Sequence, residues 1–355
     1  MRAYSYSLLA LVASLPAAAW ASPWTLPKGD LVLDTSFTYQ MATREFFETG
    51  GPRNFPLRGK YDSATVRLGA RYGINDQLEI EASFPVTLVS YRSDSVIILP
   101  RDPTSTQSEI DYYQENVIDL ARTAGGLGDI ELAARYQWIP PPFVLATELR
   151  IKTPTGYDAP AGTFGNQPKT KADLLANVGT LVRPANVRDD VTLGDGQLDL
   201  SAAVLIGYSI TDRLFARADA GYRLRLGGAG DQFFGAIRAG YLFGDSFLVF
   251  ASTAIAATVG SSDVIGVSVA AEDPDLPASE YIGLNNLHLR EVRLEKDYLT
   301  IDAGALLKVT PEVEIKAAYT RILWGRNTAL TDGVTVGVTV RADLLAEDEA
   351  DVTVN

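Results

Sequence analysis

The chain has no cysteine, and it has one histidine and two methionines among its 355 residues. Without cysteine it can form neither structural disulfides nor thiolate metal sites. It also has no run of about 20 apolar residues, so the sequence predicts no membrane-spanning helix. Basic residues number 31 against 44 acidic ones, for a net charge of −13, and no basic patch stands out. This balance argues against binding to nucleic acid.

The first 21 residues have the composition of a secretory signal peptide. Arg2 precedes an apolar run at residues 8–13, and Ala19-Trp20-Ala21 follows as a small-x-small sequence. This arrangement is typical of a cleaved signal. We therefore predict a signal peptide over residues 1–21 and a mature chain that begins at Ser22.

Alternation of apolar and polar residues dominates the rest of the sequence, and it predicts twelve β-strands. Most of these segments are as long as the roughly 9–11 residues of a tilted membrane-spanning strand, or longer. Soluble strands are nearer 5–6 residues, so the excess length indicates a membrane barrel. The predicted strands are 29–41, 61–73, 77–91, 127–138, 143–153, 196–208, 213–226, 232–243, 247–259, 296–309, 313–324 and 331–343.

The connections between these strands alternate between short turns and connections that are mostly long. The short turns are 74–76, 139–142, 209–212, 244–246 and 310–312. The opposite connections are 42–60, 92–126, 154–195, 227–231, 260–295 and 325–330. Bacterial outer-membrane barrels have short periplasmic turns, long extracellular loops and an even number of strands. We therefore predict an all-β protein, a single antiparallel transmembrane β-barrel of about 12 strands over residues 22–345, with an acidic periplasmic tail at 346–355. A secreted soluble all-β protein is the alternative.

Each predicted strand has one polar and one apolar face. In a membrane barrel the polar face lines the lumen and the apolar face contacts lipid. Opposite charges placed directly across two strands favour one register. Around three short turns this predicts Arg135 opposite Glu148, Lys308 opposite Glu314, and Arg71 opposite Glu79; Glu131 opposite Lys152 follows from the first turn. The predicted lumen-facing polar residues are Arg67, Arg71, Glu79, Glu81, Glu131, Arg135, Glu148, Arg150, Lys152, Asp199, Arg217, Asp219, Arg223, Arg238, Lys308 and Glu314.

Two of the long loops contain helix-like stretches. Residues 108–126 combine a serine cap, apolar residues at helical spacing and a glycine stop. Residues 170–184 have a threonine cap and a closing proline. Such segments either narrow the mouth of a barrel or lie on its surface, and the sequence leaves both open. Because the first strand starts within about ten residues of Ser22, we expect no N-terminal plug domain.

Catalytic and cofactor motifs are not evident in the sequence. His288 has no serine nearby in a His-x-Ser arrangement, as a lipid-cleaving barrel would need, and we interpret it as a loop residue. The acidic loops at 187–196 and 270–280 do not follow the spacing of a calcium-binding hand. We therefore expect no catalytic residues, no metal and no cofactor.

Three stretches resemble a known family. They are "RYGINDQLEIEASFPV" (71–86), "ELRIKTPTG" (148–156) and the segment 193–225 that begins "LGDGQLDLS". Together they are similar to outer-membrane transporter-like barrels grouped with the meta-pathway of phenol degradation. The resemblance implies a pore for small, often aromatic or hydrophobic compounds, and it carries no binding residue over. The tail "AEDEADVTVN" departs from the terminal aromatic residue that such barrels commonly present to the assembly machinery.

From these features we expect a barrel in the outer membrane of a Gram-negative bacterium that lets small molecules pass passively and selectively. Its partners would be outer-membrane lipid and a small-molecule solute, while its oligomeric state stays open. A closed structural or adhesive barrel is the second hypothesis, and an outer-membrane hydrolase, resting on His288 alone, is the third.

Overall fold

The computed structural model describes residues 22–46, 51–94, 96–97, 104, 106, 108, 117–118, 121–157, 193–271 and 287–345. In these parts the chain is almost entirely β-structure, with one 3₁₀ turn at Pro56–Arg58. None of the helices there is long and apolar enough to cross a bilayer. The predicted signal peptide, the helix predicted at 170–184 and the acidic tail lie outside the described residues.

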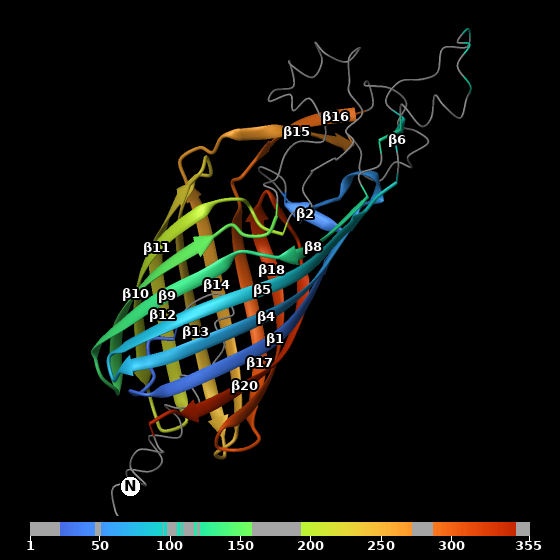
Figure 1. Cartoon of the computed structure of the whole chain (residues 1–355). Helices are drawn as coiled ribbons and strands as arrows, with labels where there is room; N and C mark the ends of the chain where they lie inside the picture. The colour runs from blue at the N-terminus through green and yellow to red at the C-terminus, as the bar shows by residue number, and fades with distance from the viewer. Residues whose placement is uncertain are drawn as a thin grey trace, which may run out of the picture.

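Twelve antiparallel strands form a closed barrel, as the sequence predicted (Figure 1). Every strand boundary falls within three residues of its predicted position. The strands are β1 (Asp30–Ala42), β4 (Lys60–Asn75), β5 (Leu78–Arg92), β9 (Ile130–Ile139), β10 (Phe143–Thr153), β11 (Leu198–Ser209), β12 (Leu214–Leu226), β13 (Asp231–Phe243), β14 (Phe247–Val259), β17 (Asp297–Lys308), β18 (Val313–Arg326) and β20 (Asp332–Asp343).

The barrel closes where its first strand meets its last. β1 pairs with β20 from Asp30 opposite Asp343 to Met41 opposite Asp332, and its other edge pairs with β4. Closure leaves no unpaired edge in the barrel wall, so the backbone groups of these strands are satisfied within the wall. This is what a strand in lipid requires.

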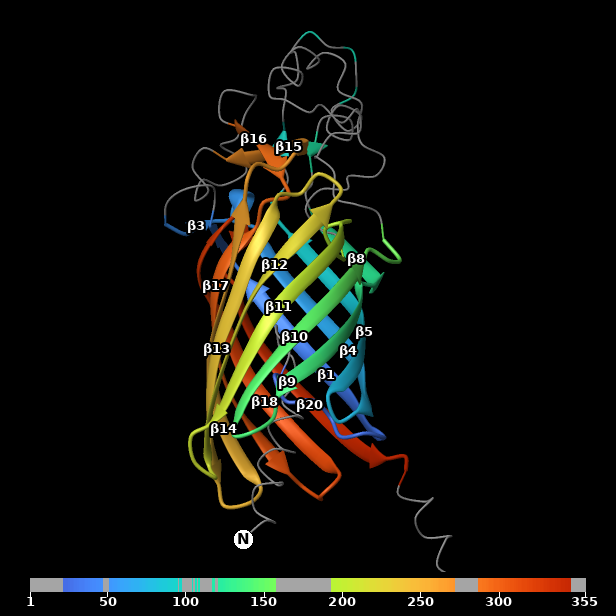
Figure 2. The ribbon, with the colours of Figure 1, turned by 90° about the vertical axis from the view of Figure 1, so that its left-hand side faces the viewer.

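Short additional strands gather at the end of the barrel opposite the short turns. The hairpin β15 (Val264–Ala271) and β16 (Leu287–Arg293) stands beyond that end (Figure 2). Smaller pairings join β2 (Arg44–Phe46), β3 (Arg53–Asn54) and β19 (Thr328–Ala329), and join β6 (Val96–Ile97) to β7 (Val117–Ile118).

The helix predicted for residues 108–126 is wrong wherever the structure describes an element in that range. Residues 117–118 form β7, and β8 (Arg122–Leu127) pairs with the outer end of β5, from Val86 opposite Leu127 to Tyr91 opposite Arg122. The long strand β5 extends beyond the end of β9 and presents a free edge there. Pairing with that edge overrides the local helical spacing.

Of the three strand registers predicted from charge pairs, two are confirmed and one is wrong. Arg135 lies opposite Glu148, Glu131 opposite Lys152, and Lys308 opposite Glu314, as predicted. The pairing of Arg71 with Glu79 is wrong by two residues, because Arg71 lies opposite Glu81. The Asn75 carboxamide oxygen accepts hydrogen bonds from the backbone of Gln77 and Leu78 at 2.9 and 2.8 Å, which tightens the turn and places a bulge after Gly73.

The two faces of the wall differ as a membrane barrel requires. On β13, Ile237 is 62% exposed on the outside, whereas its neighbour Arg238 is 3% exposed on the inside. Aromatic side chains near the strand ends are also exposed outside, as an interfacial girdle would be. They include Tyr39, Trp138, Phe143, Tyr208, Tyr241 and Phe243.

Two neighbouring residues of β20 test this assignment of faces. Val336 is 47% exposed on the outer face, and Thr335 borders the interior cavity described below. We expect Val336→Arg to destabilise the folded barrel by about 2–4 kcal/mol if it lies near the bilayer midplane. Thr335→Arg should be tolerated better, since it adds the charge to a polar interior. Urea unfolding in lipid vesicles measures both, and equal or reversed losses would contradict the assignment.

Candidate functional site: the lumen

All sixteen residues predicted to face the lumen are shielded to some degree. Nine are buried: Arg71, Glu79, Arg135, Glu148, Asp199, Arg217, Asp219, Arg238 and Glu314. The other seven are half-buried: Arg67, Glu81, Glu131, Arg150, Lys152, Arg223 and Lys308. The fold brings about half of them into two groups of ion pairs.

The first group centres on Arg135 of β9. Its guanidinium donates to Glu79 at 2.6 Å and Glu81 at 3.2 Å on β5, and to Glu148 at 2.8 Å on β10. Arg150 continues the group, donating to Glu131 at 2.7 Å and lying 3.0 Å from Glu148. Arg135 is 2% exposed, so these charges are desolvated and depend on one another. The group cross-links three adjacent strands.

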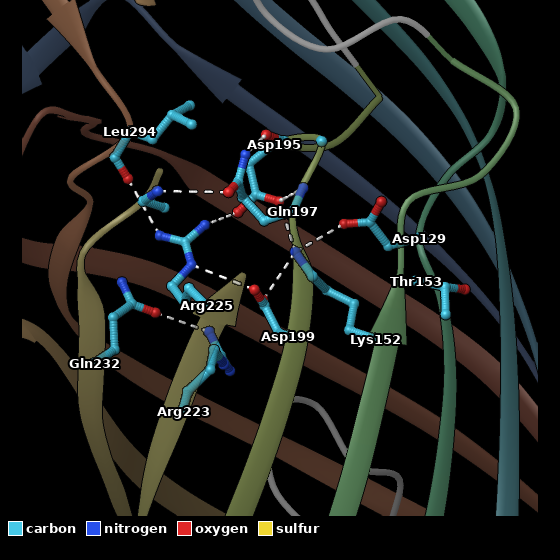
Figure 3. Close-up of polar contacts among 12 residues, drawn as sticks. Asp129, Lys152, Thr153, Asp195, Gln197, Asp199, Arg223, Arg225, Gln232 and Leu294 are labelled. Carbon is cyan, nitrogen blue, oxygen red and sulfur yellow. Dashed lines mark hydrogen bonds and ion pairs between the residues drawn. The ribbon is translucent and has the colours of Figure 1, made fainter. Parts of the chain in front are cut away.

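The second group lies nearer the long-loop end and ties a loop to the wall (Figure 3). Lys152 of β10 contacts three carboxylates at 2.6–3.1 Å, those of Asp195, Asp199 and Asp129. Arg225 of β12 bridges Asp195 and Asp199 and also donates to the Leu294 carbonyl at 3.1 Å. Asp195 precedes β11, so these bonds fix the loop end over the lumen.

Local electrostatics support this attachment. Burial alone would raise the pKa of the Asp195 carboxyl, but Lys152 and Arg225 hold that pKa below its ordinary value. Burial, together with the hydrogen bond to Asp129, raises the pKa of Tyr157. The Tyr157 hydroxyl also accepts a bond from the Gly196 backbone at 2.9 Å. The loop is therefore held by an ionised carboxylate and a neutral phenol.

The residues ahead of the first strand lie inside the barrel, which the sequence did not predict. Residues 22–27 precede β1 and enter the barrel at the short-turn end, where Trp24 is 2% exposed and Leu26 is 1% exposed. The Leu26 backbone nitrogen donates to Glu79 at 2.8 Å, and the Thr25 nitrogen donates to Gln137 at 3.1 Å. We call residues 22–27 the N-terminal segment.

Two glycines of the wall make room for this segment. A Cβ on Gly73 would lie 2.0 Å from the Pro27 carbonyl oxygen. A Cβ on Gly207 would lie 2.6 Å from Pro23 and 2.8 Å from the Trp24 ring. Any larger residue at these positions would displace the segment.

The N-terminal segment completes an apolar cluster that fills the short-turn end of the lumen. Trp24 meets Phe215 edge-on, with ring centroids 5.9 Å apart. The cluster consists of Trp24, Leu26, Val32, Val144, Phe215, Leu242, Leu248, Phe250 and Leu306. Its wall residues lie near the short-turn ends of six strands, so the barrel interior is apolar there and polar above.

A polar chamber of about 490 Å³ occupies the lumen above this cluster. Ser22 lines it, so the N-terminal segment borders the chamber. Hydroxyl groups form much of the wall on β1, β4, β5, β17, β18 and β20. They belong to Ser36, Thr38, Thr65, Ser83, Thr300, Thr320 and Thr335.

Several residues of the chamber were missing from the predicted set. Asp34, Asp302 and Lys316 line it and lie on inward faces of predicted strands. Lys316 follows Glu314 at the period of two, so strand alternation alone could have found it. The N-terminal segment gave no comparable signal, because residues 22–27 have no strand periodicity.

His288 lies on β16, opposite Ala270 in the hairpin outside the barrel. Among the described residues, no cluster of histidine and carboxylate side chains is arranged to hold a metal ion.

No protein-family model matches the sequence, and no curated protein matches it. Solved structures do match. A COG4313 outer membrane channel from Pseudomonas putida F1 has a TM-score of 0.58 and 10% identity, over 92% of this chain and 99% of that chain. The CymD monoaromatic hydrocarbon channel has a TM-score of 0.36 and 10% identity, over 90% of this chain and 89% of that one. The NanC porin has a TM-score of 0.41 and 7% identity, over 87% and 98%.

Of these three likenesses, the first supports a comparison of whole folds. It covers nearly all of both chains, and it shows that this chain shares the fold of that outer-membrane β-barrel.

Proposed function

We propose that this protein lets small molecules pass passively and selectively across the outer membrane of a Gram-negative bacterium. The observation that carries the proposal is the polar chamber of about 490 Å³ enclosed by a closed twelve-stranded wall. A barrel whose only role is structural has no need of such a chamber. The membership suggested by the sequence, in barrels grouped with the meta-pathway of phenol degradation, is part of this proposal.

The proposed orientation puts the short turns in the periplasm and the long loops outside the cell. The N-terminal segment would then close the periplasmic side of the chamber, and the chamber would open toward the outside. Cleavage after Ala21 would fit this arrangement, since it would leave the new N-terminus, Ser22, at the wall of the chamber. Lipid would contact the apolar outer face and a small solute would contact the chamber wall.

Planar-bilayer recording tests the proposal. Twelve strands enclose a lumen between the filled eight-stranded barrels and the wide sixteen-stranded porins. Ion pairs and the N-terminal segment occupy part of it here, so we expect a conductance well below that of a general porin. Heat-modifiable gel mobility confirms folding. Complete absence of current from folded protein, together with no swelling of solute-loaded vesicles, would favour the closed structural barrel.

A further inference from the structure

The chamber has an excess of basic groups although the chain as a whole is acidic, with a net charge of −13. Six basic and three acidic side chains line it. The basic residues are Arg67, Arg71, Arg135, Arg238, Lys296 and Lys316, and the acidic ones are Asp34, Glu81 and Asp302. Rings of arginine and lysine select anions in pores.

Some of these charged side chains are paired with other residues of the barrel wall. Arg135 is engaged by three glutamates, and Glu81 is shared between Arg135 and Arg150. Asp302 accepts hydrogen bonds from Thr320 and, at 3.1 Å, from Ser252. These groups are already committed to one another. Arg71 also lies 3.8 Å from Glu79, and Arg238 donates to Ser252 at 3.4 Å. The excess of basic side chains over acidic ones determines what the chamber attracts.

Lys316 is the clearest of these basic groups. It is 5% exposed, and its side chain lies across Gly337, where a Cβ would be 2.4 Å from the lysine Cε. Within the described parts of the chain it forms no hydrogen bond or salt bridge. One carboxylate, Asp34, and three arginines, Arg67, Arg71 and Arg238, line the same chamber as Lys316, so like charges outnumber the opposite charge around it. An anion in the chamber would relieve this repulsion.

An apolar surface adjoins these cations. The Arg238 guanidinium lies 4.8 Å from the centroid of the Phe250 ring. That ring covers Gly304 beside Ala318, two residues from Lys316, and Phe250, Ala318 and Tyr298 all line the chamber. A ligand with a charged head and a flat apolar body could contact both kinds of surface at once.

We propose that the chamber binds small aromatic carboxylates. The carboxylate would take hydrogen bonds from Lys316 and the neighbouring arginines, with the ring against Phe250 and Ala318. Arginine and lysine bind carboxylates through charge-assisted hydrogen bonds, which are stronger than neutral ones. This deepens the proposed function by naming the solute class, and rests on it.

Isothermal titration of the full mature barrel in detergent micelles, at low salt, tests the proposal with benzoate as the probe. Benzamide is the matched neutral compound. We expect benzoate to bind and benzamide to bind at least about tenfold more weakly, because a hydrogen bond to a charged group is stronger than one to a neutral group. Lys316→Met should weaken benzoate binding by about tenfold or more for the same reason. Lys60→Met, which removes the same charge from the exposed outer face, should leave it unchanged.

Arg67→Gln provides a second variant if Lys316→Met does not fold, and it should weaken benzoate but not benzamide. Equal affinity for benzoate and benzamide, or benzoate binding unaffected in folded Lys316→Met and Arg67→Gln, would overturn the proposal. That result would leave passive passage intact if current is still recorded in the bilayer. If benzoate binds as expected but no current is recorded, the proposed passage function is overturned and the proposed binding is not.

Discussion

Replacing Arg135 by methionine is expected to lower the free energy of unfolding of the barrel by about 3–5 kcal/mol, the usual effect of removing one partner from a buried ion pair. The guanidinium is the common partner of Glu79, Glu81 and Glu148. Without it, three carboxylates at 1%, 11% and 7% side-chain exposure lose their shared cation. Urea unfolding in lipid vesicles, followed by tryptophan fluorescence, measures the loss.

Arg321→Met is the matched control, because Arg321 pairs with Asp332 on the exposed outer face at 3.2 Å. Exposed pairs contribute only about 0–1 kcal/mol, so this variant should unfold nearly as the wild type does. Adding Glu148→Gln to Arg135→Met should restore part of the stability, since it removes one of the uncompensated charges. Equal losses for Arg135→Met and Arg321→Met would show that the buried group does not hold the three strands together.

The wall of the barrel could be predicted from sequence because a strand repeats every two residues. Each inward residue fixes the face of its neighbours, so the alternation from 213 to 226 assigned Arg217 and Asp219 to one side without knowledge of any contact. Charge pairs then fixed the register around the turns at 139–142 and 310–312. These are local constraints between residues that are close along the chain.

Contacts between residues far apart in the sequence could not be predicted from this alternation. Lys152 and Asp195 are 43 positions apart, and the pairing of β10 with β11, which places Lys152 opposite Asp199, brings them to 2.6 Å. The bulge after Gly73 depends on the Asn75 side chain, which replaces one ladder position by an Asx turn. The helical spacing within 108–126 was real but weaker than pairing with the edge of β5. Tertiary context decided each of these cases.

The N-terminal segment gives the second large effect. We expect Trp24→Ala to increase the conductance of the barrel severalfold. Truncating a buried tryptophan costs about 3–5 kcal/mol of packing, enough to raise the undocked fraction of the segment by about 10²–10⁴-fold. Trp24 packs on Phe215 and is 2% exposed, and its indole nitrogen has no hydrogen-bond partner among the described residues. The Trp24 side chain is therefore held by apolar contact, while hydrogen bonds to Glu79 and Gln137 hold the backbone of Leu26 and Thr25. Single-channel recording in planar bilayers measures the change.

Two further variants separate displacement of the segment from a general loss of stability. Gly207→Val adds atoms where a Cβ would already lie 2.6 Å from Pro23, so it should raise the conductance while leaving Trp24 in place in the sequence. Trp138→Ala makes the same substitution as Trp24→Ala on the outer face, where Trp138 is 57% exposed, and should leave the current unchanged. Unchanged currents in folded Trp24→Ala and Gly207→Val would mean that the apolar side chains of the wall limit the conductance by themselves, without the N-terminal segment. A rise in both, with none in Trp138→Ala, would place the narrowest point of the lumen at the N-terminal segment, because only that segment is common to the two changes.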